Sequence, residues 1–424
     1  MKKRKKKTNP KAQQKALSLF HFEYSLLVDR FLKDIGLEQG IDAFTGEFQQ
    51  RIVRRHNMPQ VIAAPDSVIE SNQLKMANFL FKKFLEEQQV RCIPEGPTYN
   101  LAFYFTTEID LEHSISRATP EELPNLENIR QQLKTYFDDH ETKHKIVFTR
   151  VGFILESIAY SLVGDINEIY YLTIQMGIPN HELVNYNKYK TRFINFVLHL
   201  KLREEKEIFF QNEMRKAMKL SFGITNFGVH EMLIPAKELG IDSPFGSIPL
   251  PVYIQEHALI RIHERVGIKY SSEVLLDLFF AFQQPKFKPL TKGNALIEFK
   301  MSHCKVGYLK VALAEGALLV QTFLFLTNNG TPEGEKLNHL LGMQKADKKY
   351  WEIDKLSTFL ESDLEENEEL KQLFIRAGCK SLFDYKRGPK LSHDDKTNQF
   401  STGIGNMLSN FLHKTQQSRQ EESD

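Results

Sequence analysis

The segment ALLVQTFLFL, residues 317–326, constrains the fold of this chain more than any other. Its apolar residues occupy both faces of an extended strand, which is typical of a central strand covered on both sides. Two further strands are predicted before it: residues 295–301, in which apolar and polar residues alternate, and residues 306–314. Glu315-Gly316 can form a tight turn between the second and third strands. The pattern therefore predicts an antiparallel three-stranded meander.

Helices are predicted on both sides of this meander. Residues 257–266 have helical periodicity and are followed by Gly267, which suits a left-handed C-cap. Ser272 is predicted to cap a second helix. After the meander, Thr331 precedes a proline and is predicted to cap a third helix. Residues 252–345, which we call the meander module, are thus expected to fold in the order α-α-β-β-β-α.

The rest of the chain divides by composition, and the whole is predicted to be a multidomain α+β protein. The segment GIDSPFGSIPLP contains three prolines and two glycines, a density that indicates a linker. In the N-terminal region we predict helices over residues 11–35, 71–88, 121–139 and 181–219, and a strand over residues 99–111. The predicted divisions are a disordered basic tail (1–9), a mainly helical region (10–239), the linker (240–251), the meander module (252–345), a helical extension (346–390) and a polar tail (391–424).

Composition excludes several classes of function. The chain of 424 residues has 56 Lys and Arg against 54 Asp and Glu, a net charge of +2, which argues against a strongly basic nucleic-acid binder but allows a local basic site. Its three cysteines are far apart and form no CxxC pair, so no zinc ribbon is expected. We expect a cytoplasmic protein with no membrane contact, no cofactor and no metal.

The sequence HALIRIHERVG contains the strongest candidate for a chemical site. His257, Arg261 and Arg265 recur at four-residue spacing, so on a helix they form one stripe. Histidine can transfer a proton near neutral pH, and arginine forks bind phosphate, which suits metal-independent cleavage of RNA. The alternative is an ordinary solvated helix face, in which Glu256 and Glu264 pair with the arginines.

The same residues carry a resemblance to a known family. HALIRIHERVGI is similar to the start "HALERxxERGI" of a small family of uncharacterised bacterial domains, although one residue is inserted between arginine and glycine. That family is itself similar to the RelE-like and barnase-like toxin ribonucleases. Its last strand carries a threonine, which Thr322 in LLVQTFLFL matches, with Thr327 as an alternative. The resemblance covers about 70 of the 424 residues and implies that His257, Arg261, Arg265 and Thr322 line an active groove.

Three functional hypotheses follow. The first is an RNA-directed protein, acting as a metal-independent endoribonuclease through the His/Arg groove. The second is a non-enzymatic interaction protein in which the toxin-like module is an inactive scaffold. In the third, residues 10–245 restrain a toxin module within one chain. A protein partner could bind through residues 10–239 or through the acidic segment that starts at Glu361, ESDLEENEE.

Overall fold

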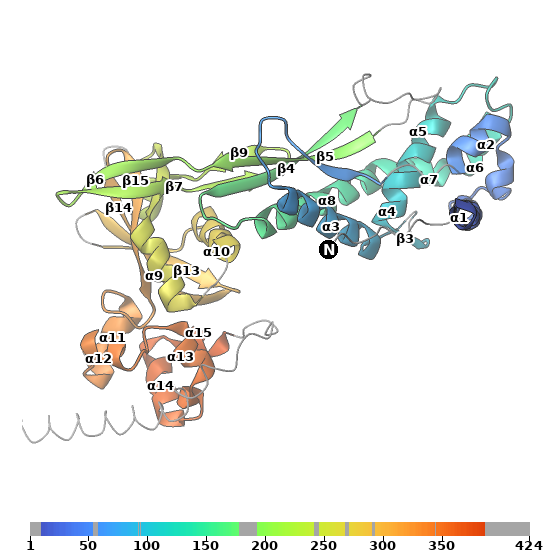
Figure 1. Cartoon of the computed structure of the whole chain (residues 1–424). Coiled ribbons are helices and arrows are strands. Elements are labelled where there is room, and N and C mark those ends of the chain that lie inside the picture. Colours follow the sequence, from blue (N-terminus) through green and yellow to red (C-terminus); the bar gives the residue numbers. More distant parts are fainter. Residues whose placement is uncertain are drawn as a thin grey trace, which may run out of the picture. The chain divides into compact units, whose positions relative to one another are not determined.

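The chain forms two compact units, and both contain helices and strands, so the α+β class is confirmed (Figure 1). The computed structural model describes residues 10–53, 58–91, 93, 95–177, 193–240, 246–267, 271–290, 293–343 and 345–385. The first unit comprises Met1–Leu162, Tyr170–Leu200 and Gly223–Gly228; the second comprises Val163–Ile169, Lys201–Phe222 and Val229–Asp424. Within the described ranges, no helix combines the length and apolar character needed to cross a bilayer.

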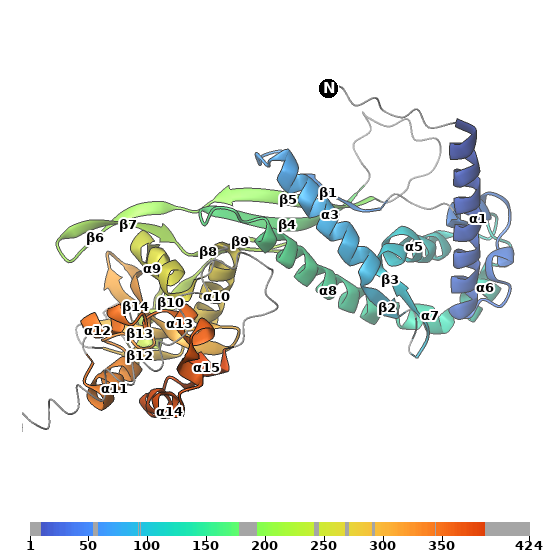
Figure 2. The same cartoon turned by 60° about the horizontal axis from the view of Figure 1, so that its bottom comes forward.

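Helices make up most of the first unit (Figure 2). They are α1 (Pro10–Asp34), η1 (Gly40–Ala43), α2 (Gly46–Val53), α3 (Ser71–Glu87), α4 (Leu101–Phe103), the π-helical turn η2 (Tyr104–Glu108), α5 (Ile109–Arg117), α6 (Leu126–Gln132), α7 (Lys134–Asp138) and α8 (His140–Ser161). Phe31 lies at the centre of their core, with its ring 5.1 Å from that of Phe103 and 6.2 Å from that of Tyr136. The helices predicted over residues 11–35 and 71–88 are confirmed by α1 and α3.

The strand predicted over residues 99–111 is wrong. Strand β3 (Thr98–Asn100) ends where the helical residues of α4 begin, because the side chain of Asn100 accepts a hydrogen bond from the backbone N–H of Phe103 at 2.8 Å and caps the helix. Residues 101–108 are then buried on every side. Because residues 101–105 are apolar and buried on every side, they show no helical period, and their aromatic sequence imitates a strand.

Long helices over residues 181–219 are also wrong. Residues 181–192 lie outside the described part, and from there the chain forms strands β5 (Phe193–Leu202), β6 (Glu205–Phe210) and β7 (Glu213–Lys219). Gln211 and Asn212 both have positive φ, 54° and 65°, as a tight hairpin turn between β6 and β7 requires. Of the charged residues 203–207, Arg203 and Glu204 lie between β5 and β6, whereas Glu205, Lys206 and Glu207 belong to β6, an edge strand, where charges discourage pairing with another chain.

A small sheet completes the first unit. Strand β5 lies between β1 (Gln60–Ala63), to which it is parallel, and β4 (Glu168–Gly177). Helix α3 is tied to β1 because the Asn78 side chain accepts from the N–H of Val61 at 2.9 Å and donates to its carbonyl at 2.7 Å. Two short pairs lie apart from this sheet, β2 (Gln89–Arg91) with β3, and β8 (Ser221–Ile224) with β9 (Gly228–Glu231).

An eight-stranded sheet forms the centre of the second unit, in the order β12-β13-β14-β15-β11-β7-β6, with β10 also paired to β11. The strands not yet introduced are β10 (Leu233–Pro235), β11 (Pro249–Gln255), β12 (Phe287–Pro289), β13 (Asn294–Met301), β14 (Cys304–Ala314) and β15 (Ala317–Phe325). The predicted meander is confirmed as β13-β14-β15. Val320 packs in the larger core and its neighbour Leu319 in the smaller one, so β15 is covered on both faces as expected.

Helices flank this sheet where the sequence indicated. They are α9 (Glu256–Val266), α10 (Ser271–Gln283) and α11 (Pro332–Leu341), followed by α12 (Lys345–Tyr350), α13 (Leu356–Glu361), η4 (Asp363–Glu365), α14 (Glu368–Ala377) and α15 (Lys380–Asp384). Gly267 ends α9 with φ of 69°, and the Thr331 side chain caps α11 by accepting from the N–H of Gly334 at 2.9 Å. Helix α10 begins at Ser271, so Ser272 lies in its first turn and is not its cap.

The predicted linker, residues 240–251, contains the start of strand β11. Pro249 and Pro251 pair with β10 at the beginning of this strand, whereas the residues from Val252 onwards form the ladders to β15 and β7. Proline is compatible with a sheet at such a first position, which explains why the proline density did not mark a linker. The second unit therefore extends beyond the meander module, and the predicted tails 1–9 and 391–424 lie outside the described residues.

Candidate functional site

The predicted stripe lies on helix α9. Its apolar neighbours Ala258, Leu259, Ile262 and Val266 are buried in the core of the second unit. His257 is exposed at the N-terminal end of the helix, and Arg261 and Arg265 are half-buried. The four-residue spacing therefore produces the helix face that the sequence predicted.

Each arginine of the stripe already has a partner. Arg261 forms an ion pair with Glu264, 2.7 Å from Nη1 to Oε2, with 40% and 51% of the two side chains exposed. Arg265 donates from Nη1 to the main-chain carbonyl of Phe323 on β15 at 2.8 Å. The Thr322 hydroxyl donates to the same carbonyl oxygen at 3.5 Å. The structure thus brings Arg265 and Thr322 together at one peptide group, where Arg265 attaches α9 to the sheet and Thr322 makes a local bond within β15.

For His257, burial and the neighbouring charges change the pKa of the imidazole. Partial burial lowers the pKa of its imidazole, and the positive charge of Arg261 lowers it further, while Glu264 acts in the opposite direction. More distant arginines, Arg265 and Arg215, act in the same direction as Arg261. At neutral pH the imidazole is therefore neutral, the form that can accept a proton.

A pocket of about 230 Å³ lies beside the first turn of α9. Its described lining residues are Asp165, Ile166, Asn167, Glu205, Lys216, Ala217, Met218, Glu256 and Leu259, so the four predicted site residues are not among them. The cation of this lining, Lys216, is 2.7 Å from Glu205 in an ion pair. The pocket is therefore acid-rich and is unsuited to a phosphate group.

Thr327, the alternative to Thr322, has a structural role. It is fully buried, and its hydroxyl donates to the carbonyl of Ile353 at 2.7 Å. Its own carbonyl accepts from Lys348 at 2.7 Å, and the same ammonium group donates to Asn329 Oδ1 at 2.9 Å and to the Gly334 carbonyl at 3.0 Å. Lys348 thus joins the loop after β15 to α11 and α12.

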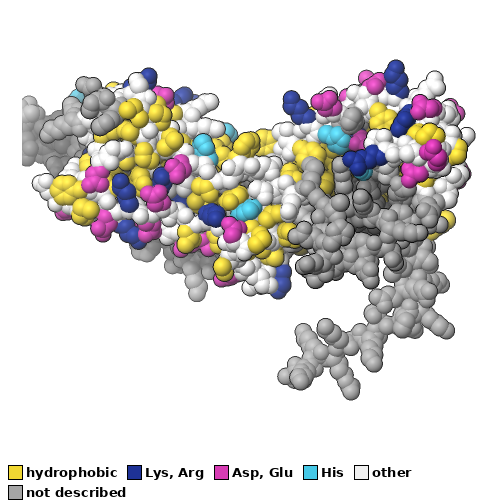
Figure 3. Space-filling view, turned by 90° about the horizontal axis from the view of Figure 1, so that it is seen from above, with side chains coloured by type: hydrophobic (Ala, Val, Ile, Leu, Met, Phe, Trp, Pro, Cys, Tyr) yellow, Lys and Arg dark blue, Asp and Glu magenta, His cyan; other side chains and the backbone are white. Residues whose placement is uncertain are grey.

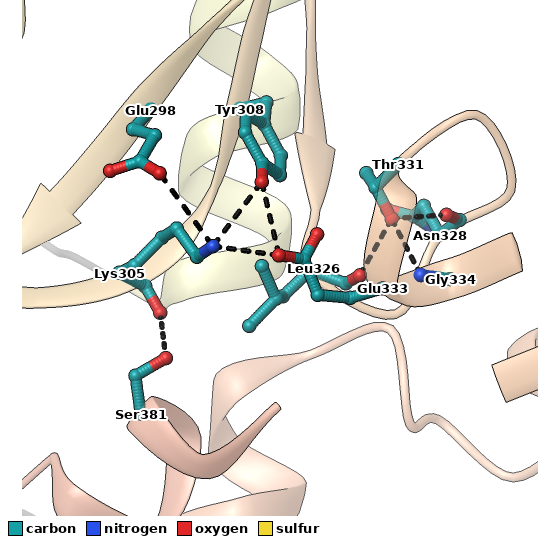
Figure 4. A network of polar contacts seen from close by, with 9 residues as sticks. All are labelled: Glu298, Lys305, Tyr308, Leu326, Asn328, Thr331, Glu333, Gly334 and Ser381. Carbon is teal, nitrogen blue, oxygen red and sulfur yellow. Dashed lines mark hydrogen bonds and ion pairs between the residues drawn. The ribbon is translucent and has the colours of Figure 1, made fainter. Parts of the chain in front are cut away.

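A second polar network joins the helical extension to the meander (Figure 4). The Lys305 ammonium donates to Glu333 Oε1 at 2.7 Å, and the Tyr308 hydroxyl donates to the same oxygen at 3.1 Å. Ser381 of α15 donates to the Lys305 carbonyl at 2.6 Å. Glu298 lies 3.7 Å from the ammonium on the neighbouring strand. These bonds connect β13, β14, α11 and α15, so the network contributes to the fold of the second unit, while Glu333 Oε2 is buried without a hydrogen-bond partner.

The first unit contains a buried ionisable cluster that the sequence did not predict. Glu108 ends the π-helical turn η2, and its Oε1 accepts from the Lys143 ammonium and from the Tyr136 hydroxyl, the latter at 3.2 Å. One turn later, Glu112 Oε2 lies 2.6 Å from Nε2 of His144, whose Nδ1 is hydrogen-bonded to the Tyr104 hydroxyl. π-helical turns recur at functional sites, so this cluster is a second candidate for a functional site.

The cluster carries two unsatisfied oxygens. Glu108 Oε2 and Glu112 Oε1 are buried and have no hydrogen-bond partner. Burial raises the pKa of Glu108 against the opposing effect of Lys143, whereas for Glu112 the effect of burial is outweighed by His144 and the pKa is lowered. The sequence signal was the pair of glutamates four residues apart, but the strand predicted there would have placed them along an extended chain. Within the described residues, no group of His, Cys, Asp and Glu side chains is placed to hold a metal ion.

The first unit also contains a pocket of about 270 Å³. It is lined by Glu23, Tyr24, Leu27, Glu86, Asn100, Ala102, Phe103 and Thr106, from α1, the end of α3 and the residues around α4 and η2. The Tyr24 hydroxyl, on its wall, is hydrogen-bonded to Thr107.

No family model, curated protein or solved structure matches this chain.

Proposed function

We propose that this chain is a non-enzymatic interaction protein in which the meander module is a structural scaffold. The observation that carries the proposal is the hydrogen bond from Arg265 to the Phe323 carbonyl. This bond gives the Arg265 guanidinium a structural role in holding α9 to β15, and Nη1, which makes it, is not available to a substrate phosphate. Arg261 is likewise paired with Glu264, although an exposed pair of this kind contributes only about 0–1 kcal/mol.

The surface of the chain supports an interaction role. Large apolar side chains are exposed on the helices of the first unit: Phe22 (61%), Phe79 (64%) and Phe153 (65%). Contiguous exposed apolar patches are typical of protein contacts, and Phe22 is followed one turn later on α1 by Leu26, which is 54% exposed. On the face drawn in Figure 3, basic and acidic side chains are intermixed, with apolar side chains between them. A protein partner bound through residues 10–239 fits this surface better than a polyanion does.

The acidic segment from Glu361 is a second place for a partner. It covers the end of α13, η4 and the start of α14, where acidic residues also stabilise the helix N-terminus. Glu365 is 3.4 Å from Lys371 and 61% exposed, so its carboxylate is accessible. A basic partner segment would be the complement of this surface.

The RNA-directed function is the second candidate, and one observation favours it. His257 is exposed, and nearby arginines help to keep its imidazole neutral at physiological pH. In this scheme His257 would transfer the proton during metal-independent RNA cleavage, Arg261 and Arg265 would hold the phosphate, and Thr322 would donate to one of its oxygens.

RNA incubated with the full chain in EDTA distinguishes the two candidates. The scaffold proposal predicts that mixed RNA stays intact with the wild-type chain and with His257→Ala. His230→Ala, at an exposed histidine on β9, is the matched control. The proposal is wrong if the wild type and His230→Ala cleave RNA while His257→Ala has lost the activity.

A further inference from the structure

The described lining of the pocket in the first unit combines apolar side chains with two carboxylates. Tyr24 and Leu27 of α1, together with Ala102 and Phe103, provide the apolar part of its described lining. Glu23, one turn before Leu27 on the same face of α1, stands at its edge. The described lining contains two carboxylates and no cation.

The neutral polar groups of the lining are used within the fold. Asn100 Oδ1 accepts from the N–H of Phe103 at 2.8 Å, and the Thr106 hydroxyl donates to the carbonyl of Ala102 at 2.8 Å. The charged groups of the described lining are the carboxylates of Glu23 and Glu86, which would attract a cationic ligand. Lys82 approaches Glu86 only to 3.8 Å, with 67% and 51% of the two side chains exposed, so this pair is weak.

Exposed apolar side chains continue from the pocket along α1. Phe22 and Leu26 are one turn apart and are 61% and 54% exposed. Leu26 adjoins Glu23 on the helix surface and Phe22 adjoins Leu26, because residues three and four positions apart are neighbours there. Leu27 is itself 38% exposed. The pocket and this part of α1 form one surface that is apolar with two negative charges, which we call the α1 surface.

We propose that the α1 surface binds a protein segment that inserts a lysine or arginine side chain into the pocket and packs apolar residues on Phe22 and Leu26. Charge complementarity to Glu23 and Glu86 selects the cation. The pocket volume of about 270 Å³ is below the 300–1,000 Å³ usual for small-molecule ligands and suits one long side chain. The adjoining apolar surface requires a partner larger than a free amine. This assignment rests on the proposed interaction function and specifies the chemistry of the partner.

The chain contains a matched pair of residues for a test. Glu86 and Glu87 are consecutive in α3, are 51% and 58% exposed, and each lies 3.8 Å from the lysine four residues before it. Of the two, Glu86 lines the pocket. Glu86→Lys and Glu87→Lys therefore make the same change to charge and to helix pairing, and they differ in whether the charge faces the pocket.

The probe is a fluorescent amphipathic peptide of leucine and lysine, and binding to the full chain is followed by fluorescence anisotropy. We expect saturable binding that Glu86→Lys weakens about tenfold or more and Glu87→Lys changes less than about twofold. Glu23→Gln, which adds no charge, should weaken binding by a smaller factor. The same peptide with glutamate in place of lysine should not bind.

Other outcomes overturn the inference. These are absence of binding by the lysine peptide, equal effects of Glu86→Lys and Glu87→Lys, or equally tight binding of N-acetyl-lysine amide, which would indicate a small-molecule site. Equal or tighter competition by an RNA oligonucleotide would assign the surface to nucleic acid. None of these results depends on RNA cleavage at His257. The peptide assay can therefore refute the pocket assignment while the scaffold proposal stands, and the cleavage assay can refute the scaffold proposal without testing the pocket.

Discussion

The guanidinium of Arg265 on helix α9 donates to the main-chain carbonyl of Phe323 on strand β15 at 2.8 Å. Because 58 residues separate the two in the chain, the bond is a long-range attachment between a helix and the central strand of the sheet. Neighbouring Arg261 instead pairs with Glu264 on its own helix. Two arginines that are equivalent in the sequence pattern therefore have different roles in the fold.

We expect Arg265→Ala to destabilise the chain by about 1–3 kcal/mol, since a buried carbonyl loses its donor. Arg261→Ala should cost about 0.5 kcal/mol or less, because it breaks an exposed pair. Urea unfolding of both variants measures the difference. Equal stability of the two variants would show that the bond to Phe323 contributes nothing.

Asp277 of α10 predicts a pH dependence of stability. Burial raises its pKa to about 7, and the negative charge of Glu273 acts in the same direction. The folded-state pKa lies above the unfolded value, so the folded chain binds this proton more tightly. The stability that the proton provides is complete below about pH 4 and is lost as pH rises through about 7.

Asp277→Asn should therefore be more stable than the wild type at about pH 8, and this advantage should be much smaller at about pH 5. Urea midpoints at the two pH values test the expectation. Glu273→Gln is the control, because it removes only the neighbouring charge and should give a smaller change of the same sign. If the urea midpoint of Asp277→Asn differs between the two pH values as much as that of the wild type does, Asp277 is not the source of the pH dependence.

Lys348 should be among the most sensitive positions of the second unit. Its side chain is buried and donates to three acceptors. Lys348→Met removes all three bonds to a charged donor and should cost at least about 2 kcal/mol. Lys349→Met, at the adjacent exposed position, should change stability by about 0.5 kcal/mol or less. Similar unfolding midpoints for the two variants would refute a stabilising role for the buried ammonium.

The buried pair of Glu108 and Lys143 should behave as a coupled unit. Lys143→Met leaves the buried Glu108 carboxylate without its cation and should cost about 3–5 kcal/mol, whereas Glu108→Gln should cost less, because Glu112 Oε1 lies 4.0 Å from the Lys143 ammonium. The double variant should recover much of that loss, because no isolated charge remains. Thermal unfolding of the single and double variants followed by circular dichroism closes this cycle. Additive losses would mean that the two groups do not interact.

The parts of the fold that were predictable from sequence are those that local pattern specifies. In the turn between β14 and β15, Glu315 and Gly316 have φ of 45° and 73°. Thr331 caps α11. Each of these signals is contained within a few residues of sequence. Strand β6 was misread as part of a helix because a charged edge strand resembles an exposed helix face until its sheet is known. The start of β11 was misread as a linker because prolines are compatible with a strand at its first positions, and the sequence alone does not show where this strand begins.

The candidate sites depended on contacts that no local pattern contains. Spacing placed His257, Arg261 and Arg265 on one face, but it could not show that Arg265 is held by a carbonyl on a distant strand. Glu108 and Lys143 are 35 residues apart, and a strand prediction separated Glu108 from its partners. Tertiary packing decides which polar groups remain available to a ligand.

The most direct test of the scaffold account is the RNA affinity of His257→Ala/Arg261→Gln, a double variant that leaves the Arg265–Phe323 bond in place. Anisotropy with a labelled RNA oligonucleotide at low salt compares it with the wild type, and any binding by other basic residues is common to both. The account predicts equal affinities. A loss of affinity of about tenfold or more, with unchanged thermal stability, would contradict it and assign α9 to RNA.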